Sequence, residues 1–336
     1  MEVDANAIRR EREKPLVPDP ADIRLGLAGM VAENDHPYSW SAILNGYDPG
    51  ALADCPNAII RAYLSARPKA DFGIPGVRVT RIWCDDPDDA ARVARTSLIA
   101  RTVTHAEDLI GEVDAVLIPT DIGGEHVERA RPFVENGVPV FIDKPLADQE
   151  KDLRCFMRWQ AEGKPLMSSS CMRYARELAE LRQRKDEIGK LRLITVTTCK
   201  SWERYGIHAL EAVYPFLQPY RWSSVANTGT EQSNLVHLRH ASGVDVVAAA
   251  IDDLYGAMGC VTLYGTAGML AARFADSFHA FKAQLAAFVQ YLRTGVAPFP
   301  FDETVDLIRM VIAGIQSREN QGKRSLLLNN FRSWAY

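Results

Sequence analysis

A lysine that directly follows a predicted strand is the first residue of this chain whose position suits chemistry. The apolar run 138–142 leads into Asp143-Lys144-Pro145, and ligands of open α/β sheets bind at the carboxyl ends of parallel strands. Oxidation of a secondary alcohol needs a base for the hydroxyl proton, and a lysine whose pKa is lowered by a positively charged nicotinamide can serve. We predict this role for Lys144, with Asp143 holding its ammonium or the backbone turn. A surface lysine at a loop start is the alternative.

A glycine follows the first predicted strand, residues 23–28, in the string GLAGMVAENDH. Gly29 stands at the first glycine position of the G-x-G-x-x-G fingerprint, but Val31 and Asn34 occupy the next two. A dinucleotide places its pyrophosphate on backbone amides at such a turn. We therefore predict cofactor contacts at Gly29, Met30 and Val31. A plain turn after a strand is the alternative.

Acidic residues end the second predicted strand, in Trp83-Cys84-Asp85-Asp86. A carboxylate here accepts hydrogen bonds from ribose hydroxyls and repels a 2′-phosphate, so Asp85 favours NAD over NADP; a solvated turn that caps the next helix is the alternative. Asp85 follows Gly29 by 56 positions, where about 20 is usual. We expect an insertion over about 36–75. Its aromatic start either caps the cofactor cleft or staples the following helix, with His36, Tyr38 and Trp40.

Strands and helices alternate in the first half of the chain and not in the second. Apolar runs predict strands at 77–83, 115–118, 138–142 and 165–168, with helices at 88–95 and 125–136 between them. This alternation indicates a doubly wound parallel sheet of the Rossmann type. A charged helix at 175–187 then precedes runs that predict a large, mainly antiparallel sheet, at 191–199, 233–240, 244–252 and 259–264, and two closing helices, at 281–294 and 302–320. We divide this α/β protein into a flexible leader (1–20), a nucleotide-binding domain (21–170) and a substrate-binding and oligomerisation domain (171–336).

Composition narrows the classes of partner. The 336 residues carry 39 Lys and Arg against 43 Asp and Glu, a net charge of −4, which disfavours nucleic acid as a partner. No apolar run reaches the roughly 18 to 20 residues that a membrane span needs, and we expect a cytoplasmic protein without a membrane partner. The six cysteines show no CxxC spacing, so we predict free thiols and no metal site.

Residues 113–147, VDAVLIPTDIGGEHVERARPFVENGVPVFIDKPLA, resemble the Gfo/Idh/MocA family of oxidoreductases. In that family a strand ends near Thr-Pro-Asn, a helix begins at a His, and a further strand delivers Glu-Lys-Pro. Thr120, His126 and Asp143-Lys144-Pro145 stand at these places. The resemblance implies a Rossmann domain that binds NAD through Thr120, His126, Asp143 and Lys144. It also implies a sugar, cyclitol or related polyol as substrate, and a homodimer or homotetramer.

A second stretch, WERYGIHALEAV, resembles the family's Gly-x-His segment at the start of the substrate-domain helix. The resemblance implies that His208 shares acid–base catalysis with Lys144; a histidine satisfied by backbone is the alternative. The family's aspartate four residues before the histidine is Arg204 here. A neighbour must then supply the missing polar group, and the candidates are Tyr205, which we rank first because a phenol can relay a proton, Glu203 and Glu211.

The remaining candidates are Arg173 and Tyr174, which follow the strand at 165–168. We predict that both line the substrate crevice together with Arg204 and His208. A salt bridge and a core aromatic are the alternatives.

The leading function is an NAD(H)-dependent oxidoreductase acting on a secondary alcohol or ketone of a sugar, cyclitol or polyol. A redox-neutral lyase or glycoside-cleaving enzyme with tightly bound NAD is the second hypothesis, and a non-catalytic sugar-binding relative is the third. Net release of NADH separates the first from the second, and failure to bind NADH would leave only the third.

Overall fold

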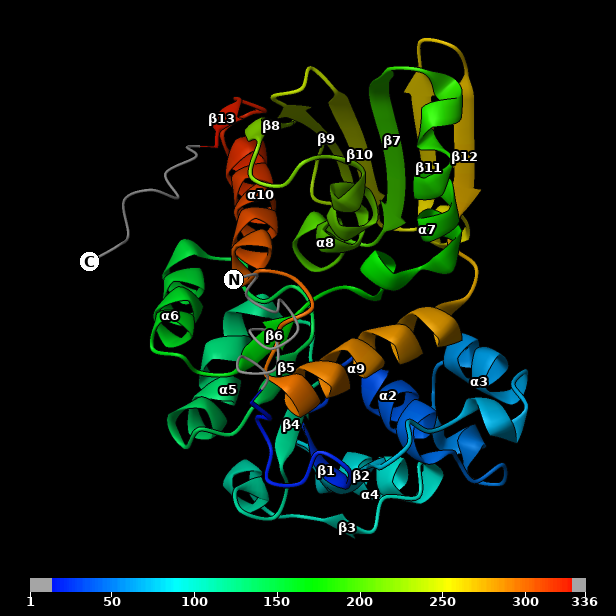
Figure 1. Cartoon of the computed structure of the whole chain (residues 1–336), viewed down its shortest axis with the longest axis vertical. Helices are drawn as coiled ribbons and strands as arrows, with labels where there is room; N and C mark the ends of the chain where they lie inside the picture. The colour runs from blue at the N-terminus through cyan, green and yellow to red at the C-terminus, as the bar shows by residue number, and fades with distance from the viewer. Residues whose placement is uncertain (1–13, 328–336) are drawn as a thin grey trace, which may run out of the picture.

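Six parallel strands form the first sheet of the computed structural model, which describes residues 14–327 (Figure 1). They lie in the order β3-β2-β1-β4-β5-β6, which is the strand order of a Rossmann fold. The crevice for a ligand therefore lies beyond the carboxyl ends of β1 and β4, where the order reverses. The strands are β1 (Ile23–Ala28), β2 (Val77–Trp83), β3 (Arg101–Thr102), β4 (Ala115–Ile118), β5 (Val140–Ile142) and β6 (Leu166–Ser168).

Helices pack on both faces of this sheet because alternate strand residues point to opposite sides. In β4, Val116 and Ile118 join one hydrophobic core and Ala115 and Leu117 join the other. The first core includes helices α5 (His126–Glu135) and α6 (Glu150–Ala161). The second includes α2 (His36–Asn45), α3 (Ala58–Ser65) and α4 (Pro87–Thr96). A sheet covered in this way needs the nearly continuous apolar strands that the sequence displays.

The expected insertion at 36–75 begins with α2, the helix that connects β1 to β2. Its aromatic residues mostly serve the core: Tyr38 is 1% exposed and Trp40 is fully buried. Neither ring can cap a cofactor cleft, because both pack inside the core between α2 and the sheet. For these two residues the prediction of a cap is wrong, and only His36 faces a cavity.

The second sheet has seven strands in the order β12-β11-β7-β10-β9-β8-β13. β7 and β10 pair in parallel and the other pairs are antiparallel, so the predicted fold class is confirmed. Helices α7 (Arg176–Gln183), α8 (Trp202–Val213) and α10 (Phe301–Glu319) accompany it. The strands are β7 (Leu191–Cys199), β8 (Trp222–Asn227), β9 (Ser233–His240), β10 (Asp245–Ile251), β11 (Cys260–Gly265), β12 (Met269–Arg273) and β13 (Ser325–Leu326).

Helix α9 (Ser277–Thr294) lies with α2 between the two sheets (Figure 1). Its residues Leu285 and Phe288 are buried in the same core as Leu25 of β1. A segment that sequence order assigns to the second domain thus stabilises the nucleotide-binding sheet. Division of the chain at residue 170 stays a prediction about folding units.

The expected leader is ordered where the structure describes it. The Leu16 N–H donates to the carbonyl of Leu292 in α9 at 2.8 Å, and Val17 is 6% exposed. Residues 14–20 are therefore part of the packed molecule, which corrects the expectation of a flexible segment there. Residues 1–13 of the predicted leader lie outside the described residues. Within 14–327, we find no helix both long enough and apolar enough to cross a bilayer.

Trp202 fixes the crossing of α8 and α10. Its indole N–H donates to the Val311 carbonyl at 3.0 Å, and the ring fills the space beside two glycines. A Cβ on Gly206 would lie 2.6 Å from the ring, and one on Gly314 would lie 2.3 Å from Nε1. The glycine of the Gly-x-His segment therefore has a packing reason that is independent of catalysis.

We expect Gly314→Ala to destabilise the fold by roughly 1–3 kcal/mol, because Trp202 must move out of a filled core. Gly256→Ala is the matched control, since a Cβ there meets no atom within 4 Å. Urea unfolding of both variants measures the difference. Equal free energies of unfolding would contradict the packing role of Trp202.

Asp306 of α10 is a buried carboxyl whose ionisation opposes folding. It is 4% exposed, and burial raises its pKa to about 6 although the Tyr214 hydroxyl donates to it at 2.8 Å. A raised folded pKa means that the protonated form is favoured, so the stabilising contribution is present below the unfolded pKa and is lost as pH rises through about 6. A shift of roughly two pKa units corresponds to about 2–3 kcal/mol.

We therefore expect Asp306→Asn to be more stable than the parent protein above pH 7, and the difference to vanish near pH 4. Unfolding free energies at the two pH values test this. A variant that is equally or less stable at pH 7 would contradict burial of an ionised Asp306.

Candidate active site

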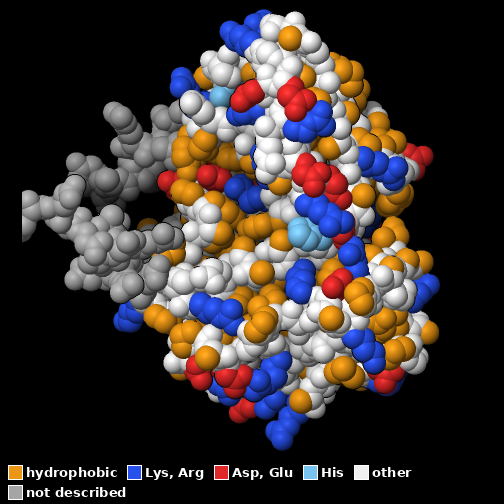
Figure 2. Space-filling model, turned by 45° about the vertical axis from the view of Figure 1, so that its right-hand side comes forward, with side chains coloured by type: hydrophobic (Ala, Val, Ile, Leu, Met, Phe, Trp, Pro, Cys, Tyr) orange, Lys and Arg blue, Asp and Glu red, His pale blue; other side chains and the backbone are white. Residues whose placement is uncertain are grey.

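A cavity of about 530 Å³ lies between the two sheets, next to the crevice of the first. His36 comes from the start of α2, Tyr205 and His208 from α8, and Phe281 from α9. Figure 2 shows hydrophobic side chains in a hollow between the upper and lower parts of the molecule, with Lys, Arg and His side chains beside them. Elements from both halves of the chain thus meet at this cavity.

Lys144 is buried behind this cavity, two residues after β5. Its side chain is 2% exposed, and Nζ lies 3.5 Å from Asp121 Oδ2 and 3.9 Å from Asp143 Oδ2. The ammonium also lies 4.7 Å from the ring centroid of Tyr205. Burial lowers the pKa of Lys144, but the two carboxylates outweigh burial and raise it. Without a cofactor, Lys144 is therefore a cation at neutral pH and not a free base.

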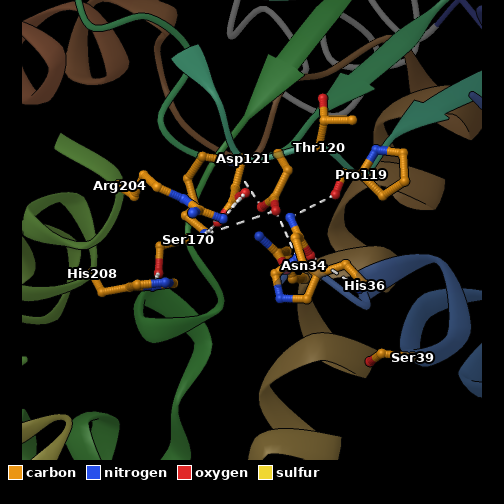
Figure 3. Close-up of polar contacts among 12 residues, drawn as sticks. Asn34, His36, Ser39, Pro119, Thr120, Asp121, Ser170, Arg204 and His208 are labelled. Atoms are coloured by element: carbon orange, nitrogen blue, oxygen red, sulfur yellow. Dashed lines mark hydrogen bonds and ion pairs between the residues drawn. The ribbon is translucent and has the colours of Figure 1, made fainter. Parts of the chain in front are cut away.

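Asp121 binds both cations of the site, and Figure 3 shows its contact with Arg204. Arg204 donates from Nη2 to Asp121 Oδ1 at 2.7 Å and from Nε to Oδ2 at 3.2 Å. Burial raises the Asp121 pKa, yet the charges of Lys144 and Arg204 outweigh it and hold the pKa well below its usual range. Asp121 therefore stays ionised and binds both Lys144, which follows β5, and Arg204 of α8.

Asp121 is the carboxylate beside Lys144 that the sequence analysis did not identify. Of the three expected replacements, Glu203 binds Arg318 and Glu211 binds Arg173, so neither reaches Lys144. The prediction of these two is wrong, because each glutamate has a nearer arginine. Asp121 supplies the carboxylate from the loop after β4, and its place next to Thr120 is the one signal that could have suggested it.

His208 lies in the middle of α8, not at its start as expected. Its Nδ1 is 2.6 Å from Ser170 Oγ (Figure 3), and its ring packs edge-on against Tyr205 at 4.8 Å between centroids. Burial and the nearby charge of Lys144 lower the His208 pKa well below the usual value. A neutral imidazole, with Nδ1 engaged by Ser170, therefore lines the cavity.

His36 lines the cavity and contacts the carboxylate of Asp143. Its Nδ1 is 2.6 Å from Asp143 Oδ2, and its ring stacks on Trp40 at 5.4 Å. The other Asp143 oxygen accepts the backbone N–H of Lys144 at 2.8 Å. Asp143, which we expected to contact the cofactor, is 1% exposed and instead positions His36 and Lys144.

A second cavity, of about 660 Å³, lies beyond the carboxyl ends of β1 and β2. It is bounded by Asp85, which is half exposed, and by Arg129, whose Nη1 donates to Asp85 at 3.0 Å. Gly29 has a φ of 102°, and a Cβ there would lie 2.9 Å from Arg129 and 3.1 Å from Thr120. Only glycine fits this turn, as expected for a backbone that approaches a ligand closely.

The rest of the turn is unlike a glycine-rich loop. Val31 forms an isolated bridge with Asn34, whose side-chain amide donates to the Pro119 carbonyl at 2.9 Å (Figure 3). Met30 and Val31 are partly buried beside this bridge. Their predicted contact with pyrophosphate stays a prediction.

Comparison with known proteins gives independent evidence on the first sheet. Residues 57–165 match the family model described as "Oxidoreductase family, NAD-binding Rossmann fold". Over this stretch the chain is similar to the nucleotide-binding domain of the Gfo/Idh/MocA family. Over 103 residues it is 38% identical to inositol 2-dehydrogenase 3 of Saccharopolyspora erythraea, an alignment that spans 30% of either protein.

Solved structures share the fold of this chain over most of its length. A putative myo-inositol dehydrogenase from Sinorhizobium meliloti superposes with a TM-score of 0.70 at 16% identity, covering 90% of this chain and 99% of that one. Myo-inositol dehydrogenase from Lactobacillus casei, solved with NAD(H) and myo-inositol, gives 0.68 at 15% identity, with 91% and 97% covered. At these identities the likeness establishes the architecture.

Two family landmarks, Thr120 and His126, support the site without reaching a cavity. Both are fully buried. His126 Nε2 lies 2.9 Å from the Thr120 carbonyl, and Nδ1 lies 3.3 Å from the Leu146 carbonyl. Burial lowers the His126 pKa. The imidazole therefore ties the loop after β4 to the loop after β5, which places Asp121 beside Lys144, and the expected direct contact with the cofactor has no exposed surface to make it.

Arg173 and Tyr174 do not line the substrate cavity. Arg173 donates to Glu303 at 2.7 Å and to Glu211, and Tyr174 packs against the core of the first sheet. The prediction for this pair is wrong because two glutamates from α8 and α10 draw the guanidinium away. The alternative of a salt bridge and a core aromatic describes them.

Proposed function

We propose that this protein is an NAD(H)-dependent oxidoreductase that interconverts a secondary alcohol and its ketone on a sugar, cyclitol or related polyol. The observation that carries the proposal is that a neutral His208 and a buried cationic Lys144 both contact the ring of Tyr205, at a cavity beside a stretch that matches an NAD-binding domain. A proton acceptor and a fixed positive charge at one place are what alcohol oxidation requires.

The part of the crevice that would hold the adenosine of NAD has two suitable features, an open glycine turn and a carboxylate. Asp85 is placed to accept a ribose hydroxyl, and Gly29 leaves the turn open to close approach. When bound, NAD accepts the hydride that leaves the carbinol carbon. Its positive nicotinamide would also lower the pKa of Lys144, whose nearest carboxylates favour the charged form.

The chain's own residues handle the proton. Donation from His208 Nδ1–H to Ser170 leaves Nε2 free to accept the substrate hydroxyl proton. Lys144 is held in place by Asp121 and Asp143 and lies against the ring of Tyr205. Its positive charge stabilises the negative charge that develops on the substrate oxygen. In the reverse direction the imidazolium returns the proton to the ketone oxygen.

Two other functions are distinguished by the fate of the nucleotide. A redox-neutral lyase or glycoside-cleaving enzyme would keep NAD bound and release no NADH. A non-catalytic sugar-binding relative would form no reduced nucleotide at all. Incubation with NAD and a panel of inositols, aldoses and polyols, followed by assay of free and protein-bound NADH, separates the three. Absence of NADH from both fractions would overturn the oxidoreductase proposal.

We expect NAD to bind more tightly than NADP, and Asp85→Asn to narrow this preference by about tenfold. In the parent protein the Asp85 carboxylate repels a 2′-phosphate and neutralises the charge of Arg129. In Asp85→Asn the charge of Arg129 is no longer neutralised by this carboxylate and attracts the 2′-phosphate. Asp86→Asn is the matched control, because Asp86 caps α4 by accepting from the Asp88 N–H. Titrations that show an unchanged ratio in Asp85→Asn, or better binding of NADPH by the parent, would contradict the assignment.

A further inference from the structure

One cation at the substrate cavity has no carboxylate partner within 4.0 Å among residues 14–327. Lys200 directly follows β7 and lines the cavity. Its Nζ donates to the backbone carbonyl of Glu33 at 3.4 Å and lies 4.8 Å from the ring centroid of Tyr205. Lys144 and Arg204, by contrast, are both satisfied by Asp121.

The backbone on both sides of this contact adopts an unusual conformation. Lys200 has a φ of 56° and Glu33 a φ of 64°, a left-handed region that residues with a Cβ rarely occupy. The Lys200 N–H also donates to the Asp252 carbonyl at 3.2 Å. Strained positions of this kind are concentrated where the chain must present a side chain to a ligand.

The neighbouring charges leave the ammonium in need of an anion. Burial lowers the Lys200 pKa, and the charges of Arg204 and Lys144 add to this effect beyond what Asp121 and Glu33 restore. The Glu33 side chain is 74% exposed and lies nearer Arg204, at 3.8 Å. Asp35 also lines the cavity, but burial raises its pKa.

The other surroundings favour an anion as well. Lys200 stands two residues before the first residue of α8, close to the positive end of that helix. Much of the remaining lining is apolar, formed by Ile59, Ile60, Met258, Phe274 and Phe281. An anionic group that enters the cavity therefore finds its nearest free charge at Lys200.

We propose that Lys200 binds a carboxylate of the substrate, so that the substrate is a polyhydroxy acid and not a neutral cyclitol. This inference rests on the proposed function, since it places the acid's hydroxyls beside Tyr205 and His208. A carboxylate fits better than a phosphate because the site offers one ammonium, with no guanidinium free to grip a second oxygen.

Binding of matched probes to the NADH-loaded protein tests the proposal. D-gluconate and D-glucitol carry the same hydroxyls along C2 to C6 and differ by a carboxylate. We expect gluconate to bind at least tenfold more tightly by calorimetry. Lys200→Met should remove this advantage and leave glucitol unchanged, and Lys200→Arg should retain most of it. Lys190→Met, at an exposed lysine before β7, is the control and should behave as the parent.

Equal affinity for gluconate and glucitol, or an unchanged gluconate affinity in Lys200→Met, would overturn the carboxylate site. Tighter binding of D-glucose 6-phosphate than of gluconate would overturn it in favour of a phosphate. Failure of the protein to bind NADH would overturn the proposed function instead. The affinities for gluconate and glucitol are then compared on the nucleotide-free protein.

Discussion

His208→Ala is expected to reduce turnover by roughly 10²- to 10⁴-fold, with NAD binding retained, because it removes the proton acceptor and leaves the nucleotide-binding sheet intact. The imidazole is neutral, lines the cavity and has Nδ1 fixed by Ser170. Steady-state rates and NAD titrations of the variant measure both quantities. His279→Ala, at an exposed histidine of α9, is the matched control and should keep parental rates.

The pH profile gives an independent reading of the same residue. A histidine with an ordinary pKa would bend the rate of oxidation between about pH 6 and 8. Burial and Lys144 lower the His208 pKa, so the base form persists at neutral pH and the rate should fall only at lower pH. Near-normal turnover in His208→Ala, or an acid limb that survives in that variant, would contradict the assignment.

Lys144→Met is expected to reduce both stability and turnover, because it removes the buried cation that Asp121 and Asp143 share. Removal of one partner from a buried ion pair costs about 3–5 kcal/mol, and Lys144 lies between Asp121 and Asp143. The loss should be largest at neutral pH and shrink at acid pH, since the lowered pKa of Asp121 means that its stabilisation is lost as pH falls.

Urea unfolding at several pH values measures this loss, with Lys151→Met on the exposed surface of α6 as control. Turnover should fall by roughly 10²- to 10⁴-fold, and the double variant with His208→Ala should lose less than the product of the single effects if both groups act on one proton. Fully multiplicative losses would mean that the two residues act separately.

Five of the six strands of the first sheet could be predicted, because they are largely buried, whereas β3 consists of two exposed residues and was missed. The bounds of β1, β2 and β4 agree with the predicted strands at 23–28, 77–83 and 115–118. Helix α2 was not predicted, because it is buried on nearly every side and lacks a polar face to mark its period. Edge strand β12 was missed for the opposite reason, since it buries too little apolar surface.

Site residues could be predicted where a local sequence pattern marks them, and not where their role depends on a partner that is distant in the sequence. Lys144 was predicted from its place after a strand, and Tyr205 and His208 from a family resemblance. In the structure Lys144 and His208 both contact the Tyr205 ring, and their catalytic roles stay predictions. Asp121 could not be assigned, because its role depends on Arg204, 83 positions away. Arg173 was misassigned for the same reason, since Glu303 reaches it from 130 positions away.

Deuterium transfer tests hydride chemistry at this cavity most directly. The panel compound that reduces NAD best is deuterated at its carbinol carbon and mixed with the NAD-saturated protein, and the nicotinamide is examined by NMR. We predict deuterium at C4 of the nicotinamide with the parent protein and roughly 10²- to 10⁴-fold slower transfer with His208→Ala, although both bind NAD. Turnover of the substrate with no deuterium on the nicotinamide, bound or free, would contradict an oxidoreductase.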